Sequence, residues 1–493
     1  MDGHLLDSKI QEAADSKRNF LDSRKVERLP YKNPVSKQLF GTDGIRGVPG
    51  EYPLDDATLE RIGLALGDYL QKRGAAAEGR AARVLIGRDT RESGLHIEEL
   101  LERGLAATST AVVSAGVLTT PGVAWIVRNE GFAAGVVISA SHNPYHDNGV
   151  KLVSSSGMKF PDAVEAEIEK EILGLASAGS ASGGAKKKSG SAPKIGHDPK
   201  LVEDYLESLR SVAPKKDALK KMKIVMDCAN GASSPLAPRL FRSLGAEVLA
   251  MNDAPDGKNI NAGCGSLHPE KMQARVVKER ADMGVAFDGD ADRAIFSSGK
   301  GELVNGDGVL LAMGRHMKKH KTLKTSTIVG TTMANLGMER ALARSDLKLA
   351  RAAVGDRYVL EEMQRIGANL GGEQSGHILF LDDATTGDGM LTAVKIASLV
   401  AMEGPLDELV GDLKIYPQII VNVKVKSKPK LETLAGVSKT LKEAEESLGE
   451  TGRVVLRYSG TEQLARVMVE AELEADVKKW SDALAEALKK EIG

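Results

Sequence analysis

Cysteine is nearly absent from this chain, which has only Cys228 and Cys264 among its 493 residues. The two lie far apart and neither belongs to a CxxC pair, which argues against a disulfide framework and against a thiolate-ligated metal site. This scarcity of cysteine fits a reducing compartment, and we therefore expect a cytoplasmic protein.

Excess charge and long apolar runs are also missing. The 67 Lys and Arg residues are balanced by 68 Asp and Glu, so the net charge is -1 and no surplus of positive charge favours nucleic-acid binding. No stretch approaches the roughly 20 apolar residues of a membrane span, and the first 20 residues carry charges throughout instead of the apolar segment of a signal peptide. We expect neither a nucleic-acid partner nor a membrane.

The length and composition predict several domains. Residues 1–37 are polar and predict an N-terminal extension, and residues 174–198, rich in Ala, Gly, Ser and Lys, predict a flexible insertion. The predicted domains span residues 38–198, 199–303, 304–414 and 415–493.

Three segments repeat one pattern, in which a short apolar strand runs into a polar turn and then a helix-forming stretch. They are RVLIGRDTRESG, KIVMDCANGASSPLAPRLF and STIVGTTMANLGMERAL. Each is followed, after a helical stretch, by a second strand ending in an unusual loop: AGVVISASHNP, MGVAFDGDADR and GANLGGEQSGH. Since ligands bind beyond the carboxyl ends of strands in α/β sheets, we expect three related α/β domains whose loops meet over one cleft. The last stretch predicts a smaller α+β domain.

The loop DGDADR follows the apolar strand MGVAF and spaces Asp288, Asp290 and Asp292 two residues apart. A tight loop can turn three such carboxylates onto one hard cation, and Mg²⁺ is the expected ion. An EF-hand is excluded because Arg293 stands where that motif needs Gly and Gly299 where it needs Glu. Arg293 offers a guanidinium fork to phosphate oxygens, so the loop predicts a metal together with a phosphoryl group. The alternative is a solvated acidic turn.

The stretch GVVISASHNPYHDNGVKL places Ser141, His142 and Lys151 at the end of another apolar strand. A serine hydroxyl can carry a phosphoryl group covalently when a base and a metal assist the transfer. Taken alone, however, a serine in a polar turn is usually an ordinary turn residue.

The loop GGEQSGH offers Glu373, Ser375 and His377 at alternate positions. In extended backbone such side chains point to one side, where they can bind several hydroxyls of one sugar. A glycine-rich turn with incidental polar residues is the alternative.

The stretch RYSGTE surrounds Gly460 with Arg457, Ser459 and Thr461. A guanidinium, two hydroxyls and free backbone N–H groups together can form a concave binding site for an anion. A plain hairpin turn is the alternative.

Taken together and in order, FGTDGIRG at 40–47, SASHNPYHDNGVK, DGDADR, GGEQSGH and RYSGTE resemble the α-D-phosphohexomutase superfamily across the chain from about residue 38. Within it, FGTDGIRG, GGEQSGH and VGDRYV at 354–359 look most like the phosphoglucosamine mutase subfamily. The resemblance implies a heart-shaped, four-domain α/β enzyme of the isomerase class. Three of its domains would be related mixed-sheet α/β units and the fourth a C-terminal α+β domain.

The resemblance also implies roles for the motif residues. Ser141 would be phosphorylated, and its phosphate would share one Mg²⁺ with Asp288, Asp290 and Asp292. Arg46 and Lys151 would frame the transfer, with Lys151 and His142 as candidates for proton transfer and Arg293 close to the phosphoryl group. Sugar hydroxyls would be held by Glu373 and Ser375, with His377 near them. The phosphate that is not reacting would be bound by Arg457, Ser459, Gly460 and Thr461.

The reaction implied is the interconversion of glucosamine 6-phosphate and glucosamine 1-phosphate through a phosphoserine enzyme and a 1,6-bisphosphate. Glucose or glucosamine 1,6-bisphosphate would act as activator, a small phosphosugar would be the substrate, and a homodimer is a candidate assembly. Two departures from the usual motifs stand out: Ala291 replaces a Gly in the metal loop, and Gln463 replaces a Pro after SGTE.

Three other functions are alternatives. A phosphomannomutase or phosphoglucomutase of the same superfamily would differ in the sugar it accepts. A metal-dependent sugar phosphatase would use the acidic loop and release inorganic phosphate, which leaves Ser141 without a purpose. A non-catalytic phosphosugar-binding protein would be expected to lack the nucleophile or a metal ligand, and this sequence retains both.

Overall fold

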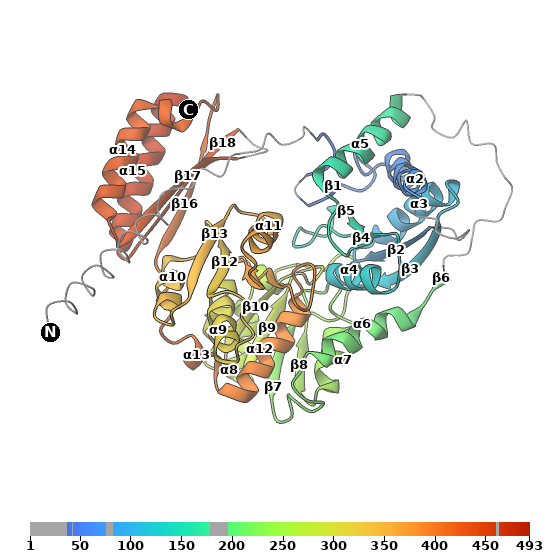
Figure 1. Ribbon diagram of the computed structural model, residues 1–493, viewed down its shortest axis with the longest axis horizontal. Coiled ribbons are helices and arrows are strands. Elements are labelled where there is room, and N and C mark those ends of the chain that lie inside the picture. The colour runs from blue at the N-terminus through green and yellow to red at the C-terminus, as the bar shows by residue number, and fades with distance from the viewer. Residues whose placement is uncertain (1–36, 42, 75–81, 178–195, 460–462) are drawn as a thin grey trace, which may run out of the picture.

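Four β-sheets with their helices follow one another along the chain in the computed structural model (Figure 1). The structure describes residues 37–41, 43–74, 82–177, 196–459 and 463–493. The predicted N-terminal extension therefore lies outside the described residues except for Lys37. Within the described part of the chain, no helix combines the length and the apolar composition needed to cross a membrane.

The first domain is a six-stranded sheet of order β1-β5-β4-β2-β3-β6 with helices on both faces. Its elements are β1 (Ile45–Gly47), α2 (Asp56–Lys72), β2 (Arg83–Arg88), α3 (Gly94–Ala107), β3 (Ala111–Val117), α4 (Thr120–Asn129), β4 (Ala134–Ile138), β5 (Asn148–Ser154), α5 (Asp162–Ser177) and β6 (Gly196–His197). Successive side chains of a strand face opposite ways, so Val84 and Ile86 pack with α2 and α3 while Leu85 between them packs with α4.

The second domain is a five-stranded sheet of order β11-β10-β9-β7-β8. Its elements are α6 (Pro199–Ser211), β7 (Lys223–Asp227), α7 (Ala237–Ser243), β8 (Glu247–Met251), the short 3₁₀ helix η2 (Gly265–Leu267), α8 (Glu270–Glu279), β9 (Met283–Phe287), β10 (Ala294–Ser298) and β11 (Leu303–Val304). Strand β9 is buried along its whole length, because α8 covers one face of the sheet and the shared core of the first three domains covers the other.

The third domain is a four-stranded sheet of order β13-β12-β14-β15. Its elements are α9 (Gly306–Lys319), β12 (Thr327–Thr331), α10 (Leu336–Ala343), β13 (Lys348–Ala352), α11 (Asp356–Ile366), β14 (Leu370–Gly372), β15 (Ile378–Phe380), α12 (Gly389–Glu403) and α13 (Leu406–Leu409). Helices α9 and α12 contribute to a hydrophobic core that also takes in side chains of the first and second domains.

One strand arrangement recurs in these three domains. In each, a first strand pairs in parallel with the second and third strands, and the third pairs antiparallel with a fourth. The four strands are β2, β3, β4 and β5 in the first domain, β7, β8, β9 and β10 in the second, and β12, β13, β14 and β15 in the third. The expectation of three related α/β domains is confirmed. The three predicted loops all connect the third strand to the fourth.

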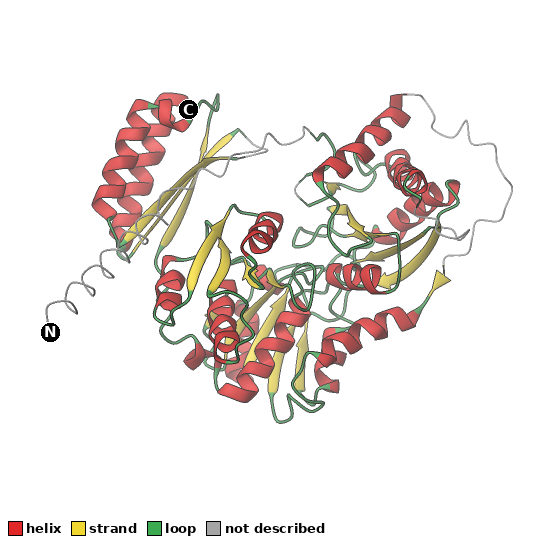
Figure 2. Cartoon of the chain, in the orientation of Figure 1, coloured by secondary structure: helices red, strands yellow, loops and turns green. Residues whose placement is uncertain are grey.

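The fourth domain is an antiparallel sheet of order β16-β18-β17 packed against two helices (Figure 2). Its elements are β16 (Gln418–Lys424), the 3₁₀ helix η3 (Leu431–Thr433), α14 (Ala435–Leu448), β17 (Gly452–Tyr458), β18 (Leu464–Ala471) and α15 (Glu474–Ile492). This domain has its own hydrophobic core, and polar contacts join it to the third domain: Glu470 accepts from the Leu336 N–H over 2.9 Å, and Arg453 donates to the carbonyls of Thr332 and Ala334 over 2.7 Å each.

The predicted flexible insertion at 174–198 is wrong at its two ends. Helix α5 continues to Ser177, since Leu, Ala and Ser there still permit helix, and β6 pairs in parallel with β3 through Gly196 and His197. Asp198 then caps α6 by accepting from the Lys200 N–H over 3.0 Å. The stretch between the two ends lies outside the described residues.

Helices α2 and α3 pack so closely that glycine is required where they cross. A Cβ on Gly104 would lie 2.1 Å from the carbonyl oxygen of Glu60, and one on Gly63 would lie 2.2 Å from that of Leu101. Backbone atoms cannot yield as the end of a flexible side chain can, so these two positions need glycine.

We expect Gly104→Ala to destabilise the protein by about 1–3 kcal/mol, because the added methyl group overpacks the helix crossing. Gly174→Ala is the matched control, because Gly174 lies in α5 with open space around its Cβ position. There alanine should stabilise the helix by about 0.5–1 kcal/mol. Urea unfolding of the two variants measures both effects, and shifts of the same sign would contradict the close approach.

Candidate active site

Ser141 lies in the loop that follows β4. Its side chain is buried, and its hydroxyl donates to Oδ2 of Asp288 over 2.7 Å. Its backbone has a φ of 53°, in the left-handed region, and its N–H donates to the Ser139 hydroxyl over 2.9 Å. Few residues other than glycine adopt this conformation, so the loop holds the serine in a strained position beside the acidic loop.

Arg91 holds the backbone of the Ser141 loop. Its buried guanidinium pairs with Asp89 over 2.8 Å and donates to four carbonyl oxygens of the loop. Those carbonyls belong to Ser141, Asn143, Pro144 and Asp147. Sequence reasoning missed Arg91, whose only signal was its place in a turn directly after the apolar strand RVLIGR.

Asp288, Asp290 and Asp292 occupy the equivalent loop of the second domain, between β9 and β10. All three are buried, and each offers a carboxylate oxygen within 4.8 Å of the other two. Burial and the neighbouring charges of Asp292 and Asp290 raise the pKa of Asp288 well above its ordinary range. Oδ1 of Asp290 and Oδ1 of Asp292 are buried and have no hydrogen-bond partner among the residues that the structure describes. Crowded, unpartnered carboxylate oxygens are suitable ligands for a hard cation, so these residues fit the expected Mg²⁺.

Ala291 shows why glycine is usual at the middle of this loop. Its φ of 55° lies in the left-handed region, which glycine enters freely and alanine only at a cost of about 1–2 kcal/mol. The departure noted in the sequence therefore adds strain to the acidic loop and removes no ligand.

Lys151, on β5, bridges the acidic loop to the motif FGTDGIRG. Its Nζ lies 2.8 Å from Oδ2 of Asp290 and 2.9 Å from Oδ2 of Asp43. Burial alone would lower the pKa of Lys151, but Asp290 and Asp43 outweigh it and raise the pKa above its ordinary value. Lys159 continues the chain of charges from Asp43, 2.7 Å away, to Asp356 of the third domain, 2.6 Å away. Sequence reasoning missed Asp43, Lys159 and Asp356, which no motif singles out as partners.

Basic groups surround the hydroxyl of Ser141. Nδ1 of His142 lies 3.3 Å from the hydroxyl and 3.4 Å from Nη1 of Arg293. Burial and the charges of Arg293 and Arg46 lower the pKa of His142 below its ordinary value. Arg46 itself pairs with Asp43 over 2.6 Å. The structure therefore brings Arg46, His142, Lys151 and Arg293 together around the first two loops.

The third loop, between β14 and β15, contacts the second. His377 is buried with Nδ1 3.5 Å from Oδ2 of Asp292, so it contacts the acidic loop. Glu373 accepts from the Gly355 N–H over 3.0 Å and from the hydroxyl of Ser375 over 3.5 Å. Of the three predicted sugar-binding side chains, Ser375 is exposed, Glu373 is half-buried and His377 is buried.

Arg457 and Ser459 lie at the end of β17 in the fourth domain. Arg457 lines a pocket of about 170 Å³ with Met333 and Val354 of the third domain. The carbonyl of Ser459 accepts from Nζ of Lys428 over 2.7 Å. The other two predicted phosphate-binding residues, Gly460 and Thr461, lie outside the described residues.

Three helices begin directly on these loops. The first N–H groups of α4, α9 and α12 donate over 3.0–3.1 Å to loop carbonyls, those of Asp290, Gln374 and Ala291. Thr119, Asn305 and Asp388 cap these helices with their side chains. A helix N-terminus carries partial positive charge, which opposes the negative charge of the acidic loop.

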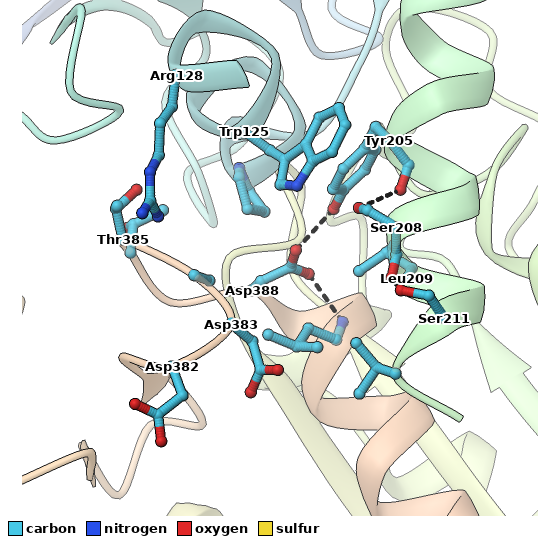
Figure 3. Close-up of a pocket in the computed structure, with 15 residues that line it drawn as sticks. Trp125, Arg128, Tyr205, Ser208, Leu209, Ser211, Asp382, Asp383, Thr385 and Asp388 are labelled. Carbon is cyan, nitrogen blue, oxygen red and sulfur yellow. Dashed lines mark hydrogen bonds between the residues drawn. The ribbon is translucent and has the colours of Figure 1, made fainter. Parts of the chain in front are cut away.

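A separate pocket of about 250 Å³ lies between α4, α6 and the segment before α12 (Figure 3). Across it, the hydroxyl of Tyr205 donates to Asp388 over 2.8 Å. The other oxygen of Asp388 accepts from the Leu391 N–H and so fixes the start of α12. Burial raises the pKa of Asp388 to about 6. The lining residues belong to none of the five motifs, so this pocket is not the predicted cleft.

A buried serine beside three carboxylates, within three domains that share this loop arrangement and a fourth of α+β type, defines a phosphohexomutase. Profiles of phosphoglucomutase/phosphomannomutase domains match the chain at residues 37–178 (α/β/α domain I), 203–301 (domain II), 305–416 (domain III) and 420–487 (C-terminal domain). The chain belongs to the phosphoglucomutase/phosphomannomutase family, and the resemblance seen in its motifs is confirmed. It is therefore an intramolecular phosphotransferase of the isomerase class.

Two similar relatives are both phosphoglucosamine mutases. The chain is 51% identical over 473 residues to the phosphoglucosamine mutase of Koribacter versatilis, covering 94% of this chain and 99% of the relative. It is 49% identical over 463 residues to the phosphoglucosamine mutase of Solibacter usitatus, and the match covers 93% of this chain and 100% of the relative.

Solved structures share the fold. A phosphoglucomutase/phosphomannomutase family protein from Burkholderia thailandensis is 22% identical with a TM-score of 0.71, covering 92% of this chain and 98% of that one. The N-acetylphosphoglucosamine mutase of Aspergillus fumigatus, solved with GlcNAc-6P and magnesium, is 19% identical with a TM-score of 0.58. The match covers 89% of this chain and 87% of that one.

We expect Arg91→Met to lower the free energy of unfolding by about 3–5 kcal/mol, because it leaves the buried Asp89 carboxylate without its opposite charge and four carbonyls without the guanidinium that donates to them. Arg103→Met is the matched control, since Arg103 forms an exposed pair with Glu60 over 2.9 Å and should change stability by about 1 kcal/mol or less. Denaturant unfolding measures both. Equal, small losses would show that Arg91 does not hold the Ser141 loop.

Proposed function

We propose that this phosphohexomutase interconverts glucosamine 6-phosphate and glucosamine 1-phosphate, with Ser141 as the phosphoryl carrier. The observation that carries the proposal is the 2.7 Å contact between the Ser141 hydroxyl and Asp288, in a loop cluster with three buried carboxylates. The names of the relatives above support the amino sugar as substrate.

The transfer would proceed in two half-reactions. The free hydroxyl of the bound sugar phosphate attacks the phosphorus of phosphoserine and loses its proton, while the bond from phosphorus to Ser141 Oγ breaks and Oγ takes up a proton. The resulting 1,6-bisphosphate turns round and returns its other phosphoryl group to Ser141 by the reverse steps. A bisphosphate that left before turning round would leave Ser141 unphosphorylated, so added bisphosphate would act as activator by phosphorylating the serine again.

Asp288, Asp290 and Asp292 would hold Mg²⁺, which when bound supplies positive charge to the oxygens of the transferring phosphoryl group. Arg293, which lies 3.4 Å from His142, and Arg46, whose charge also acts on His142, are placed to add further positive charge near the Ser141 loop.

The two candidates for proton transfer differ in their surroundings. Lys151 lies between Asp290 and Asp43, which keep it protonated, so we assign it the role of a fixed positive charge. The pKa of His142 is lowered, so its imidazole is neutral near pH 7, and its Nδ1 is 3.3 Å from Oγ of Ser141. We therefore assign proton transfer at Oγ to His142.

The sugar and the distant phosphate would be held by the remaining two loops. Glu373 and the exposed Ser375 would bind sugar hydroxyls, while His377 would hold Asp292 in position. Arg457, Ser459, Gly460 and Thr461 would bind the phosphate that is not reacting, since a guanidinium, hydroxyls and N–H groups suit an anion.

We expect Ser141→Ala to remove mutase activity, by at least about a thousandfold, while the fold is kept. Ser155→Ala, in an exposed turn, is the matched control and should retain full activity. The assay supplies glucosamine, glucose or mannose 6-phosphate with glucose 1,6-bisphosphate and follows both the 1-phosphate and inorganic phosphate. Turnover in Ser141→Ala would overturn the carrier. A preference for glucose or mannose phosphate would overturn the amino-sugar assignment, and phosphate as the main product would indicate a phosphatase.

Asp290→Asn should raise the Mg²⁺ concentration needed for half-maximal activity by about tenfold or more, because an amide is a poorer ligand for a hard cation than a carboxylate. Asp346→Asn, in an exposed turn, is the control and should leave that concentration unchanged. An unchanged Mg²⁺ requirement in Asp290→Asn would show that the metal binds elsewhere.

A further inference from the structure

Two histidines and a glutamate meet at the far end of the two helices that begin on the active-site loops. His316 lies in the last turn of α9, His320 follows the end of that helix, and Glu403 is the last residue of α12. Each offers one ligand atom within 4.8 Å of the other two. Helices α9 and α12 contact each other and lie side by side in Figure 1.

The spacing of the histidines places both on one face of α9, because residues four apart in a helix are neighbours. Their ring centres are 4.5 Å apart. Oε1 of Glu403 lies 2.7 Å from Nδ1 of His316 and 3.5 Å from Nε2 of His320. Two ligands that are each about 2.1 Å from a tetrahedral zinc ion are about 3.4 Å apart, so small side-chain adjustments close the cluster around one ion.

The C-terminal ends of the two helices favour a cation at the cluster, against the one positive charge that Lys319 already adds beside it. The C-terminal end of a helix carries partial negative charge, and both α9 and α12 end at the cluster. Nζ of Lys319 lies 3.0 Å from Oε2 of Glu403, so the lysine fixes the oxygen that does not face the histidines. A hydrogen-bonded partner of this kind orients a ligating carboxylate.

We propose that His316, His320 and Glu403 form a second metal site, for Zn²⁺ or a similar imidazole-binding divalent cation. Imidazole nitrogens suit Zn²⁺, whereas Mg²⁺ prefers oxygen ligands, so the two sites of the chain take different ions. Binding through Nδ1 of His316 displaces the proton that this nitrogen shares with Glu403. His320 is 53% exposed, which leaves the fourth position open to water.

The ion would join the two helices across the shared core of the first three domains. Helices α9 and α12 have 14 and 15 residues, so the cluster lies about 20 Å from the active-site loops where they begin. At that distance the ion takes no part in phosphoryl transfer. Its effect is on stability, because a ligand that binds only the folded chain shifts the unfolding equilibrium towards the folded state.

The test is thermal unfolding of the full-length chain, stripped of metal and returned to excess Mg²⁺ so that the acidic loop is occupied. Micromolar Zn²⁺ should raise the unfolding temperature of the wild type, and Co²⁺ should give the visible absorption bands of a four-coordinate ion. In His320→Ala the affinity for Zn²⁺ should fall at least tenfold and the Co²⁺ bands should be lost. Glu403→Gln should weaken binding as well.

His96→Ala is the matched control, because His96 is also exposed and also lies beside a carboxylate, Asp56 at 2.9 Å, but has no second histidine near it in sequence. It should respond to Zn²⁺ as the wild type does. The proposal is overturned if Zn²⁺ leaves the wild-type unfolding temperature unchanged, or if His320→Ala and the wild type bind Zn²⁺ equally.

Discussion

Negative charge buried in the loop between β9 and β10 is the constraint on which the rest of the site depends. Three carboxylates lie within 4.8 Å of one another with water excluded, an arrangement that repels itself unless positive charge surrounds it. Lys151 comes from the first domain, Arg293 from the second and His377 from the third. Because these partners come from three different domains, neutralising this loop links the domains to one another, and the Ser141 hydroxyl lies beside the loop.

Repetition of one strand arrangement explains how three domains can serve a single loop. In each, the segment from the third to the fourth strand leaves the sheet at the carboxyl end of a parallel strand, where ligands of α/β proteins bind. The helices that start on these loops, α4, α9 and α12, run back into the shared hydrophobic core. Packing of the core therefore fixes the loops as well as the fold.

The fourth domain is attached to the rest of the chain in a different way. Its core is its own, and the contacts that join it to the third domain are largely polar, such as those of Glu470 and Arg453. Polar junctions of this kind resist separation less than a continuous hydrophobic core does. The reacting groups thus lie in the three domains that share one hydrophobic core, and the fourth domain is attached outside that core.

Local pattern alone determined much of this protein. The apolar strands that end in polar loops predicted the three related domains, and the spacing of Asp288, Asp290 and Asp292 predicted their convergence, because both depend on residues close together in the chain. Only the tertiary structure decided which side chains pair with one another around the site. Arg91 contacts carbonyls about 50 residues away, and Lys159 meets Asp356 across 197 residues. His377 contacts the acidic loop, although the sequence suggested a place among sugar hydroxyls. Such pairings depend on how whole sheets pack, and no short stretch of sequence records that.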